Sequence, residues 1–168
     1  MQIYPAEKIM TLSEAERWRW RLREDQKKLV LTNGCFDILH RGHTEYLYKA
    51  RQYGDALIVL MNSDASVRSL KGSGRPVNDQ YSRAFVLSSL YFIDAVTVFG
   101  DSDCSSLISV IKPDIYTKGA DYSLDTINSD EKNALMKVGA DIKFIEFTDG
   151  FSTTATIENM KISGGENE

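Results

Sequence analysis

Short apolar runs alternate with segments of helical periodicity along most of the chain. The apolar runs are predicted to be strands because they are short and apolar at consecutive positions, which is typical of strands buried on both faces. They cover residues 29–33, 56–61, 95–99, 114–118 and 141–147. The helical patterns follow these runs or lie between them, at residues 42–52, 64–70, 80–91, 104–111, 129–138 and 152–161.

This alternation predicts an α/β protein. Strands separated by helices form βαβ units, whose strands lie parallel in a sheet that helices cover on both faces. A length of 168 residues suits one domain. We therefore expect a single doubly wound, Rossmann-like domain with a five-stranded parallel sheet at residues 27–162. Residues 1–26 would form an N-terminal helical extension, and residues 163–168 a flexible tail.

The extension carries its own helix signal. Ser13 and Glu16 have the spacing of a capping box, which predicts a helix that begins at Ser13 and ends near Arg23. We interpret this helix as a packing or dimer surface rather than a carrier of chemistry. Its apolar face would present Leu12, Ala15, Trp18 and Leu22.

Composition narrows the class of protein. The chain is 42% hydrophobic and 26% charged with a net charge of -4, so it offers no general electrostatic surface for nucleic acid. Cys35 and Cys104 make no metal-ligand spacing and are expected to be reduced thiols. The first ten residues lack the apolar stretch of a secretory signal, and no apolar run nears the ~18 residues that span a bilayer. These observations favour a cytoplasmic protein without a membrane or nucleic-acid partner.

The first predicted strand leads into the densest cluster of candidate chemistry. The only two histidines of the chain, His40 and His43, lie three residues apart on an opening helical turn, so their rings share a side. Gly42 between them would let a ligand approach the backbone. Free N–H groups at a helix N-terminus attract phosphate. The cluster predicts phosphate chemistry; a surface pair of histidines is the alternative, and two histidines are a poor zinc set.

The segment TNGCFDILHRGH at residues 32–43 resembles the signature of the HxGH nucleotidyltransferase superfamily, the cytidylyltransferase-like proteins. Four further segments extend the likeness: NSDASV, LKGSGRPVN, KPDIYTKGADY and DGFSTT. Together they are similar to the adenylyltransferase domain of the ADP-heptose synthase family, over residues 27–161. The kinase domain often fused to that domain has no counterpart here, so we expect the stand-alone transferase form.

The resemblance implies a role for each matched position. The catalytic residues would be His40, His43 and Lys71. The nucleotide would be bound by Asn33, Gly34, Cys35, Phe36, Gly42, Lys118, Gly119, Asp121, Ser152, Thr153 and Thr154. The acceptor would be bound by Asp37, Asn62, Asp64, Arg75 and Arg83. No protein-held metal site is expected, and Mg²⁺ would act together with ATP.

Several of these residues also have an ordinary structural explanation. Asp37 can order its own turn, an interpretation that we favour over direct catalysis. Residues 62–64 can cap the next helix, and Arg83 can pair with Asp79 on the surface. The remaining alternatives are a solvated basic loop for Lys71 and Arg75, a tight turn for residues 118–121, and a helix cap for Ser152.

The resemblance implies Mg²⁺-dependent transfer of AMP from ATP to a sugar 1-phosphate, D-glycero-β-D-manno-heptose 1-phosphate, by a homodimer. A cytidylyltransferase for glycerol 3-phosphate or another small phosphorylated alcohol is the alternative. Thr148 and Asp149 disfavour glycerol phosphate, because those enzymes carry an Arg-Thr pair there. A non-catalytic nucleotide sensor is a second alternative. The absence of GxGxxG after the first strand disfavours a dehydrogenase, and the absence of KMSKS disfavours an aminoacyl-tRNA synthetase.

Overall fold

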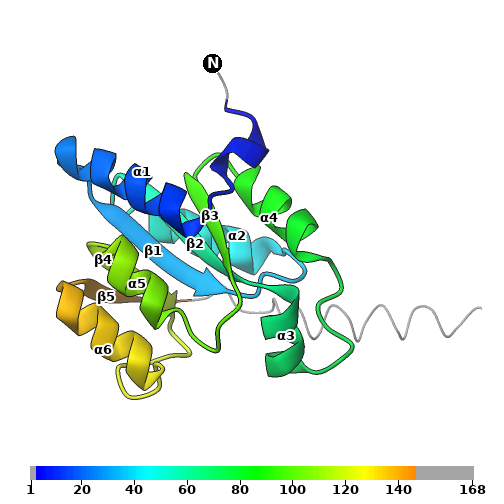
Figure 1. Ribbon diagram of the computed structural model, residues 1–168. Helices are drawn as coiled ribbons and strands as arrows, with labels where there is room; N and C mark the ends of the chain where they lie inside the picture. The colour runs from blue at the N-terminus through cyan, green and yellow to red at the C-terminus, as the bar shows by residue number, and fades with distance from the viewer. Residues whose placement is uncertain (1–2, 147–168) are drawn as a thin grey trace, which may run out of the picture.

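A parallel β-sheet forms the centre of the protein in the computed structural model, which describes residues 3–146 (Figure 1). Within that range the sheet has five strands: β1 (Leu29–Gly34), β2 (Ala56–Asn62), β3 (Ala95–Phe99), β4 (Ile115–Gly119) and β5 (Asp141–Ile145). Their order is β3-β2-β1-β4-β5, and every neighbouring pair is parallel. The predicted fold is confirmed.

Helices cover both faces of this sheet (Figure 1). One face carries α1 (Leu12–Glu24), α5 (Ser105–Ile111) and α6 (Ser129–Val138), and the other carries α2 (Arg41–Arg51) and α4 (Gln80–Ser88). The short α3 (Asp64–Lys71) follows β2, and a 3-10 turn, η1 (Pro5–Lys8), precedes α1. None of the helices in the described part of the chain is long and apolar enough to cross a membrane.

Each strand contributes alternate side chains to two apolar layers. In β1, Leu29 and Leu31 pack with α1, α5 and α6, whereas Val30 packs on the opposite face with α2 and α4. All three side chains are fully buried. Because successive side chains of a strand point to opposite faces, two buried faces require consecutive apolar residues.

The N-terminal helix begins at Leu12, and its cap lies two residues before the predicted one. Thr11 is the N-cap: its side chain accepts a hydrogen bond from the Glu14 N–H, and the Glu14 carboxylate accepts one from the Thr11 N–H. The capping box predicted from Ser13 and Glu16 is therefore wrong. Thr11 and Glu14 offer the same chemistry two residues earlier, which leaves Ser13 inside the first turn.

Helix α1 packs on the sheet, which is the first of the two roles predicted for it, a packing surface or a dimer surface. Ala15 and Leu22 lie in the core, and Trp18 is half-buried against it. Arg19 is also buried, and its guanidinium donates to the Asp114 carboxylate at 2.8 Å and to the Lys112 carbonyl at 3.2 Å. The other oxygen of Asp114 accepts from the N–H of Leu29, so this pair ties α1 to the start of β1 and β4.

Helix α4 is shorter than predicted. It ends at Ser88 rather than at residue 91, and the hydroxyls of Ser88 and Ser89 both donate to the Phe85 carbonyl. Serine side chains that bond to the preceding turn compete with helix continuation. The predicted helix at residues 152–161 and the end of the predicted last strand lie outside the described residues.

The strand order creates one topological switch point. Strand β1 has β2 on one side and β4 on the other, so the chain leaves β1 in opposite directions in the two halves of the sheet. Ligands of open α/β sheets bind outside the carboxyl ends of the strands at such a point. The site is therefore expected beyond Gly34 and Gly119.

Candidate active site

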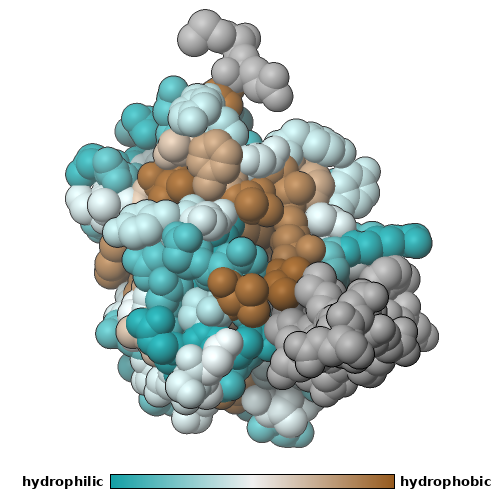
Figure 2. Space-filling view, turned by 90° about the vertical axis from the view of Figure 1, so that its right-hand side faces the viewer, coloured by the Kyte–Doolittle hydropathy of each residue, from teal (hydrophilic) through white to brown (hydrophobic). Residues whose placement is uncertain are grey.

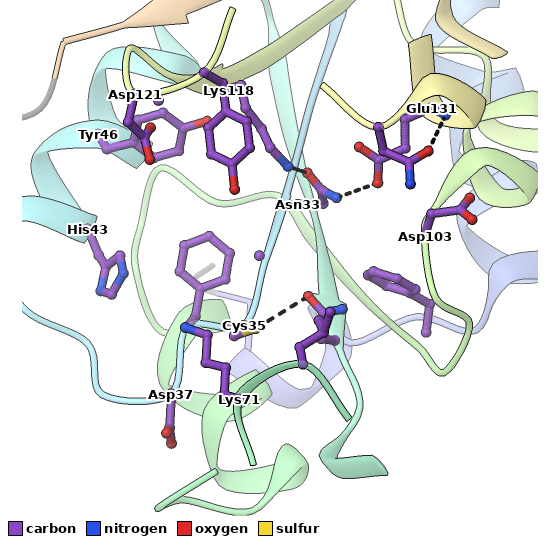
Figure 3. A pocket seen from close by; sticks show the side chains of 18 of the residues that line it. Asn33, Cys35, Asp37, His43, Tyr46, Lys71, Asp103, Lys118, Asp121 and Glu131 are labelled. Carbon is purple, nitrogen blue, oxygen red and sulfur yellow. Dashed lines mark hydrogen bonds between the residues drawn. The ribbon is translucent and has the colours of Figure 1, made fainter. Parts of the chain in front are cut away.

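A cavity of about 620 Å³ opens at the carboxyl ends of the strands, at the switch point (Figure 3). Its volume falls within the range of roughly 300–1,000 Å³ that is typical of small-molecule sites. Of the sequence-predicted residues, those that line it are Asn33, Gly34, Cys35, Phe36, Asp37, His43, Asn62, Lys71, Lys118, Gly119 and Asp121. The structure thus brings together residues from four distant segments of the chain.

The turn after β1 has a constrained backbone. Phe36 has a φ of 46°, in the left-handed region that non-glycine residues rarely adopt. Its ring lies over Gly34, where an added Cβ would come within 2.9 Å of the ring. The ring also contacts His43 edge to face, with 5.3 Å between centroids. Gly34 is therefore needed for the aromatic packing that supports His43.

The two histidines have different positions. His40 is the N-cap of α2, and its Nδ1 accepts from the His43 N–H at 3.3 Å. Its ring stacks on the His43 ring with 3.8 Å between centroids, but only His43 lines the cavity. Gly42 is buried in the first turn of α2 and does not line the cavity. Within the HxGH turn, His43 is thus the side chain available to a ligand in the cavity.

Both imidazoles favour the neutral form. Burial lowers the pKa of His43 to about 4. Electrostatic repulsion from protonated His40 and from Lys71 acts in the same direction, and a hydrogen bond to the Ile38 backbone opposes it. Burial also lowers the pKa of His40. At neutral pH, His43 is therefore an uncharged hydrogen-bonding group that can donate to a phosphate without itself titrating.

Asp37 organises the Gly-rich loop between α3 and α4. Its carboxylate accepts from Arg75 at 2.5 Å, from the Val77 N–H at 2.7 Å and from the Asn78 N–H at 3.2 Å. Burial acts to raise the pKa of Asp37, but these hydrogen bonds outweigh it and lower the pKa below its usual range. Asp37 is thus an ionised residue that fixes a distant loop at residues 75–78, whereas the sequence favoured an ordering role within its own turn. Arg75 is engaged in this pair and does not line the cavity.

Arg83 is buried and does not form the surface pair with Asp79 considered from sequence. Its guanidinium donates to the Cys35 carbonyl, to the Asn78 carbonyl at 3.0 Å and to the Asp64 carboxylate at 2.8 Å. Asp79 instead caps α4 by accepting from the N–H groups at positions 81 and 82. Arg83 therefore joins the β1–α2 turn to the loop before α4, beside a second, smaller cavity of about 110 Å³.

Helix α3 carries Lys71 to the edge of the cavity. Ser63 is the N-cap of this helix, which confirms that a residue of the 62–64 segment caps it. Lys71 is the last residue of α3 and is exposed; in Figure 3 its amine points toward the turn that carries Cys35. Burial raises the pKa of the Cys35 thiol despite the positive charge of Lys71. Asn62 lines the cavity floor and donates to Ser66 at 3.0 Å.

The end of β4 supplies the opposite wall. Lys118 donates to the Asn33 side-chain oxygen across the two central strands. Its ammonium also lies 5.1 Å from the centre of the Tyr122 ring and 5.7 Å from that of Tyr116. Asp121 follows in the turn and lines the cavity. An ammonium has three N–H donors, and the Asn33 oxygen uses only one of them. The remaining N–H groups of Lys118 can therefore donate to a ligand, while the aromatic rings stabilise its charge.

Sequence reasoning missed Glu131 of α6, which is buried and lines the cavity. Its carboxylate contacts Asn33, Cys104 and Tyr116. Of these three residues, the sequence had assigned only Asn33 to the site. A signal existed: Glu131 shares a helical face with Ala134, Leu135 and Val138. A charged residue on an otherwise apolar helical face marks a buried, partnered group.

The remaining predicted site residues, Ser152, Thr153 and Thr154, lie outside the described residues. Arg75 is ion-paired with Asp37, and Arg83 with Asp64. None of Arg75, Asp64 and Arg83 lines the cavity. The roles assigned to individual side chains stay predictions.

The sequence model of the cytidylyltransferase-like family matches residues 31–163. Among curated relatives, "Bifunctional protein HldE" of Campylobacter jejuni (strain 81116) is 50% identical over 144 residues. The protein of the same name from a Nitratiruptor species is 44% identical over 154 residues. These alignments cover 83% and 91% of this chain but only 29% and 32% of the relatives. The chain thus spans about three tenths of the length of the relatives it matches.

Two solved structures share the fold. The lipopolysaccharide core biosynthesis protein of Thermoplasma volcanium has a TM-score of 0.60 and 29% identity, over 74% of this chain and 99% of that one. Pantoate-beta-alanine ligase of Francisella tularensis, in complex with an ATP analogue and beta-alanine, also has a TM-score of 0.60 but only 15% identity. It covers 92% of this chain and 77% of that one, and at this identity it supports the fold alone.

Proposed function

The chain belongs to the cytidylyltransferase-like family, and from that premise we propose that it is a nucleotidyltransferase that moves AMP from ATP to a sugar 1-phosphate. The products are a nucleoside diphosphate sugar and pyrophosphate. The acceptor that we propose is D-glycero-β-D-manno-heptose 1-phosphate, and the product is ADP-heptose. The likeness to the ADP-heptose synthase family, through relatives 44% and 50% identical, supports this choice of acceptor.

One observation carries the proposal: the cavity at the switch point gathers the HxGH turn, Lys71 and the Lys118–Asp121 turn around one space. A nucleoside triphosphate needs polar groups for its base, ribose and phosphates within one site. Phosphoryl transfer itself asks mainly for positioning and for stabilisation of charge on the transferred group. The lining supplies both cations and neutral donors for that purpose.

The chemistry follows from the side chains available. A phosphate oxygen of the acceptor attacks the α-phosphorus in line, a new P–O bond forms, and the bond to the pyrophosphate oxygen breaks. His43, neutral because burial lowers its pKa to about 4, donates a hydrogen bond to a phosphoryl oxygen. Lys71 offsets negative charge at the mouth of the cavity. No general base is required, because a phosphate acceptor is already ionised at neutral pH.

Magnesium enters this scheme with the nucleotide. Among the described residues no three His, Cys, Asp or Glu side chains gather into a metal site, and Asp37 already satisfies Arg75. Mg²⁺ commonly retains several waters and is bound through substrate phosphates plus one or two carboxylates. The donor set thus suits MgATP as the substrate, with Asp121 and Asp103 as carboxylates that line the cavity.

We further propose that the protein acts in the cytoplasm and as a homodimer. An exposed apolar surface is available for self-association. Figure 2 shows apolar residues gathered on the side of the molecule that lies to the right in Figure 1, where α4 runs. Exposed apolar side chains there include Phe85 and Val86 of α4. The Phe85 ring packs edge to face with that of Tyr4, with 5.9 Å between ring centroids.

The decisive experiment measures pyrophosphate release with each of ATP, CTP, GTP and UTP. Every nucleotide is paired with heptose 1-phosphate and, separately, with glycerol 3-phosphate. Release with ATP and heptose 1-phosphate, absent without the acceptor, is the expected result. Mass spectrometry of the same mixtures identifies the nucleotide sugar.

The alternatives give different patterns. Release only with CTP and glycerol 3-phosphate would overturn both the nucleotide and the acceptor, and indicate a cytidylyltransferase. Binding of a nucleotide without release in any mixture would indicate a sensor. The heptose assignment alone fails if ATP is used with a different sugar phosphate.

A further inference from the structure

A buried carboxylate lines the nucleotide cavity next to Asn33. Glu131 of α6 is only 5% exposed, and none of the ion pairs among residues 3–146 includes it. Its Oε1 accepts from Asn33 at 3.0 Å and from the Cys104 N–H and thiol at 3.3 and 3.1 Å. Its Oε2 lies 3.2 Å from the Tyr116 hydroxyl, whose single proton is shared with the nearer Asn33 oxygen. A buried charge is costly to retain even when it is hydrogen-bonded. The contacts of Asn33 suggest what this charge does.

Asn33 connects this carboxylate to Lys118. Its Nδ2 donates to Glu131, and its Oδ1 accepts from Lys118 and, at 2.8 Å, from the Tyr116 hydroxyl. Figure 3 shows the three side chains in a row across the cavity, with dashed lines from Lys118 to Asn33 and from Asn33 to Glu131. The order of groups is therefore carboxylate, amide and ammonium.

The carboxylate decides which way the amide points. Because an ionised carboxylate only accepts hydrogen bonds, it selects the NH₂ end of Asn33 and turns the carbonyl oxygen toward Lys118. An amide turned by 180° would direct its NH₂ group at the ammonium and leave the carboxylate facing an oxygen. Both contacts would then be repulsive, so Glu131 fixes an acceptor for Lys118 without touching it.

We propose that Glu131 is a positioning residue that orients the Asn33 amide and thereby holds the Lys118 ammonium in place for the nucleotide. The inference rests on the proposed function, since it takes the cavity to be the nucleotide site. Lys118 is bonded to one amide oxygen and flanked by the rings of Tyr116 and Tyr122, which leaves ammonium protons for a ligand. A hydrogen bond from a charged donor is strong only when its geometry is fixed in advance.

Calorimetric binding of ATP in the presence of Mg²⁺ tests this role in a double-mutant cycle. Glu131→Leu and Lys118→Met are each expected to weaken ATP binding about tenfold, the equivalent of one well-placed hydrogen bond to a charged group. Combined, they should weaken it no more than Lys118→Met alone, because one acts through the other. Independent effects, with a loss of about a hundredfold in the double variant, would contradict the proposal.

Exchange of the amide and carboxylate gives a second test that does not depend on Glu131→Leu folding. Asn33→Asp places two carboxylates against each other and should weaken ATP binding about tenfold. Adding Glu131→Gln restores one amide and one carboxylate with the original total charge, and lets the new carboxylate at position 33 accept from both neighbours. Recovery to within about threefold of the wild-type affinity is expected. A double variant as weak as Asn33→Asp alone would overturn the positioning role.

Leu135→Ala is the matched control, because Leu135 is fully buried one turn further along α6 and does not line the cavity. It should lower the urea midpoint and leave ATP affinity unchanged. Equal loss of affinity in Leu135→Ala and Glu131→Leu would mean that α6 matters only for packing. If the wild type binds no nucleotide, the proposed function fails and the inference with it. If the wild type binds ATP and Glu131→Leu binds it as tightly, only the inference fails.

Discussion

At the scale of single residues, the HxGH turn divides its work between two histidines. His40 caps α2 and stacks on its neighbour, whereas His43 lines the cavity. Phe36 adopts a left-handed backbone at a φ of 46°, and its ring supports His43 from the other side. The motif is thus partly a small structural unit that presents one imidazole to the site.

His43→Ala should reduce kcat roughly 100- to 1,000-fold, the usual effect of removing one preorganised donor to a transition state. KM for ATP should change much less. The variant should remain folded at 25 °C without urea, as its urea unfolding curve will show. His43→Gln retains a neutral donor and is expected to recover part of the lost rate. Steady-state pyrophosphate release measures both variants, and a kcat near that of the wild type in His43→Ala would contradict the role given to this imidazole.

The low pKa of His43 makes stability depend on pH. Its folded pKa of about 4 lies below the ordinary value of 6.5, so between these values the unfolded chain binds a proton that the folded chain does not. The contribution of neutral His43 to the free energy of unfolding is therefore complete above about pH 6.5 and is lost as pH falls toward 4. Urea unfolding at pH 7 and pH 5 should show a smaller loss of stability in His43→Ala than in the wild type. Equal losses would argue that His43 titrates normally in the folded protein.

At the scale of elements, caps and loop contacts fix how the helices approach the site. The capping box of α1 is formed by Thr11 and Glu14, although the sequence offered Ser13 and Glu16 at the same spacing. The Gly-rich loop after α3 has no regular structure in which to bury its polar groups. It depends instead on Asp37 from the β1–α2 turn.

Thr11→Ala should lower the free energy of unfolding by about 1 kcal/mol, because it removes the acceptor for the N–H of Glu14. Ser13→Ala, the matched control, lies inside the first turn and should change it by less than about 0.5 kcal/mol. Neither residue lines the cavity, so turnover should be unchanged. Chemical denaturation distinguishes the two, and a larger effect of Ser13→Ala would restore the cap predicted from sequence.

Asp37→Asn should loosen the loop at residues 72–79, since the neutral amide loses the ion pair with Arg75 and weakens the bonds from Val77 and Asn78. We expect a loss of stability of about 1–3 kcal/mol and faster tryptic cleavage after Lys71. Asp79→Asn is the control in the same loop, because Asn retains the helix cap that Asp79 provides. If both variants resist trypsin like the wild type, Asp37 does not hold the loop.

At the scale of the whole molecule, the two apolar layers leave different surfaces exposed. Helix α1 uses Ala15 and Leu22 for the core, so its half-buried Trp18 serves packing first. The α4 side keeps apolar side chains at the surface (Figure 2). For the proposed dimer contact, this distribution favours α4 over α1, which the sequence left open as either a packing or a dimer surface.

Phe85→Glu on α4 should convert the proposed homodimer into a monomer, because a charge in the middle of an apolar contact is expensive to bury. Trp20→Glu is the control, as Trp20 is an exposed aromatic residue on α1. Sedimentation velocity at micromolar protein concentration measures both. Dissociation by Trp20→Glu and not by Phe85→Glu would return the contact to α1, and a monomeric wild type would exclude the homodimer.

Much of this architecture was determined by the sequence alone. Short runs of consecutive apolar residues, such as that at 56–61, are typical of a strand buried on both faces, which made the parallel sheet predictable. The HxGH turn and the 118–121 turn were also readable, because each follows a buried strand and carries polar groups at the edge where α/β sheets bind ligands. These are local signals, in which neighbouring residues suffice.

Tertiary structure decided what depends on distant partners. Whether Arg83 would face solvent or the interior depended on the carbonyls of Cys35, 48 residues away, and of Asn78, five residues away. No hydrophobic periodicity encodes such contacts. Glu131 became part of the site only when packing placed α6 against Cys104 and the end of β1, 98 residues away in the chain. The polar residues that line a site are visible in sequence when a motif carries them. The groups that orient those residues are chosen by burial, where the energy of a hydrogen bond depends on which partner the fold brings within reach.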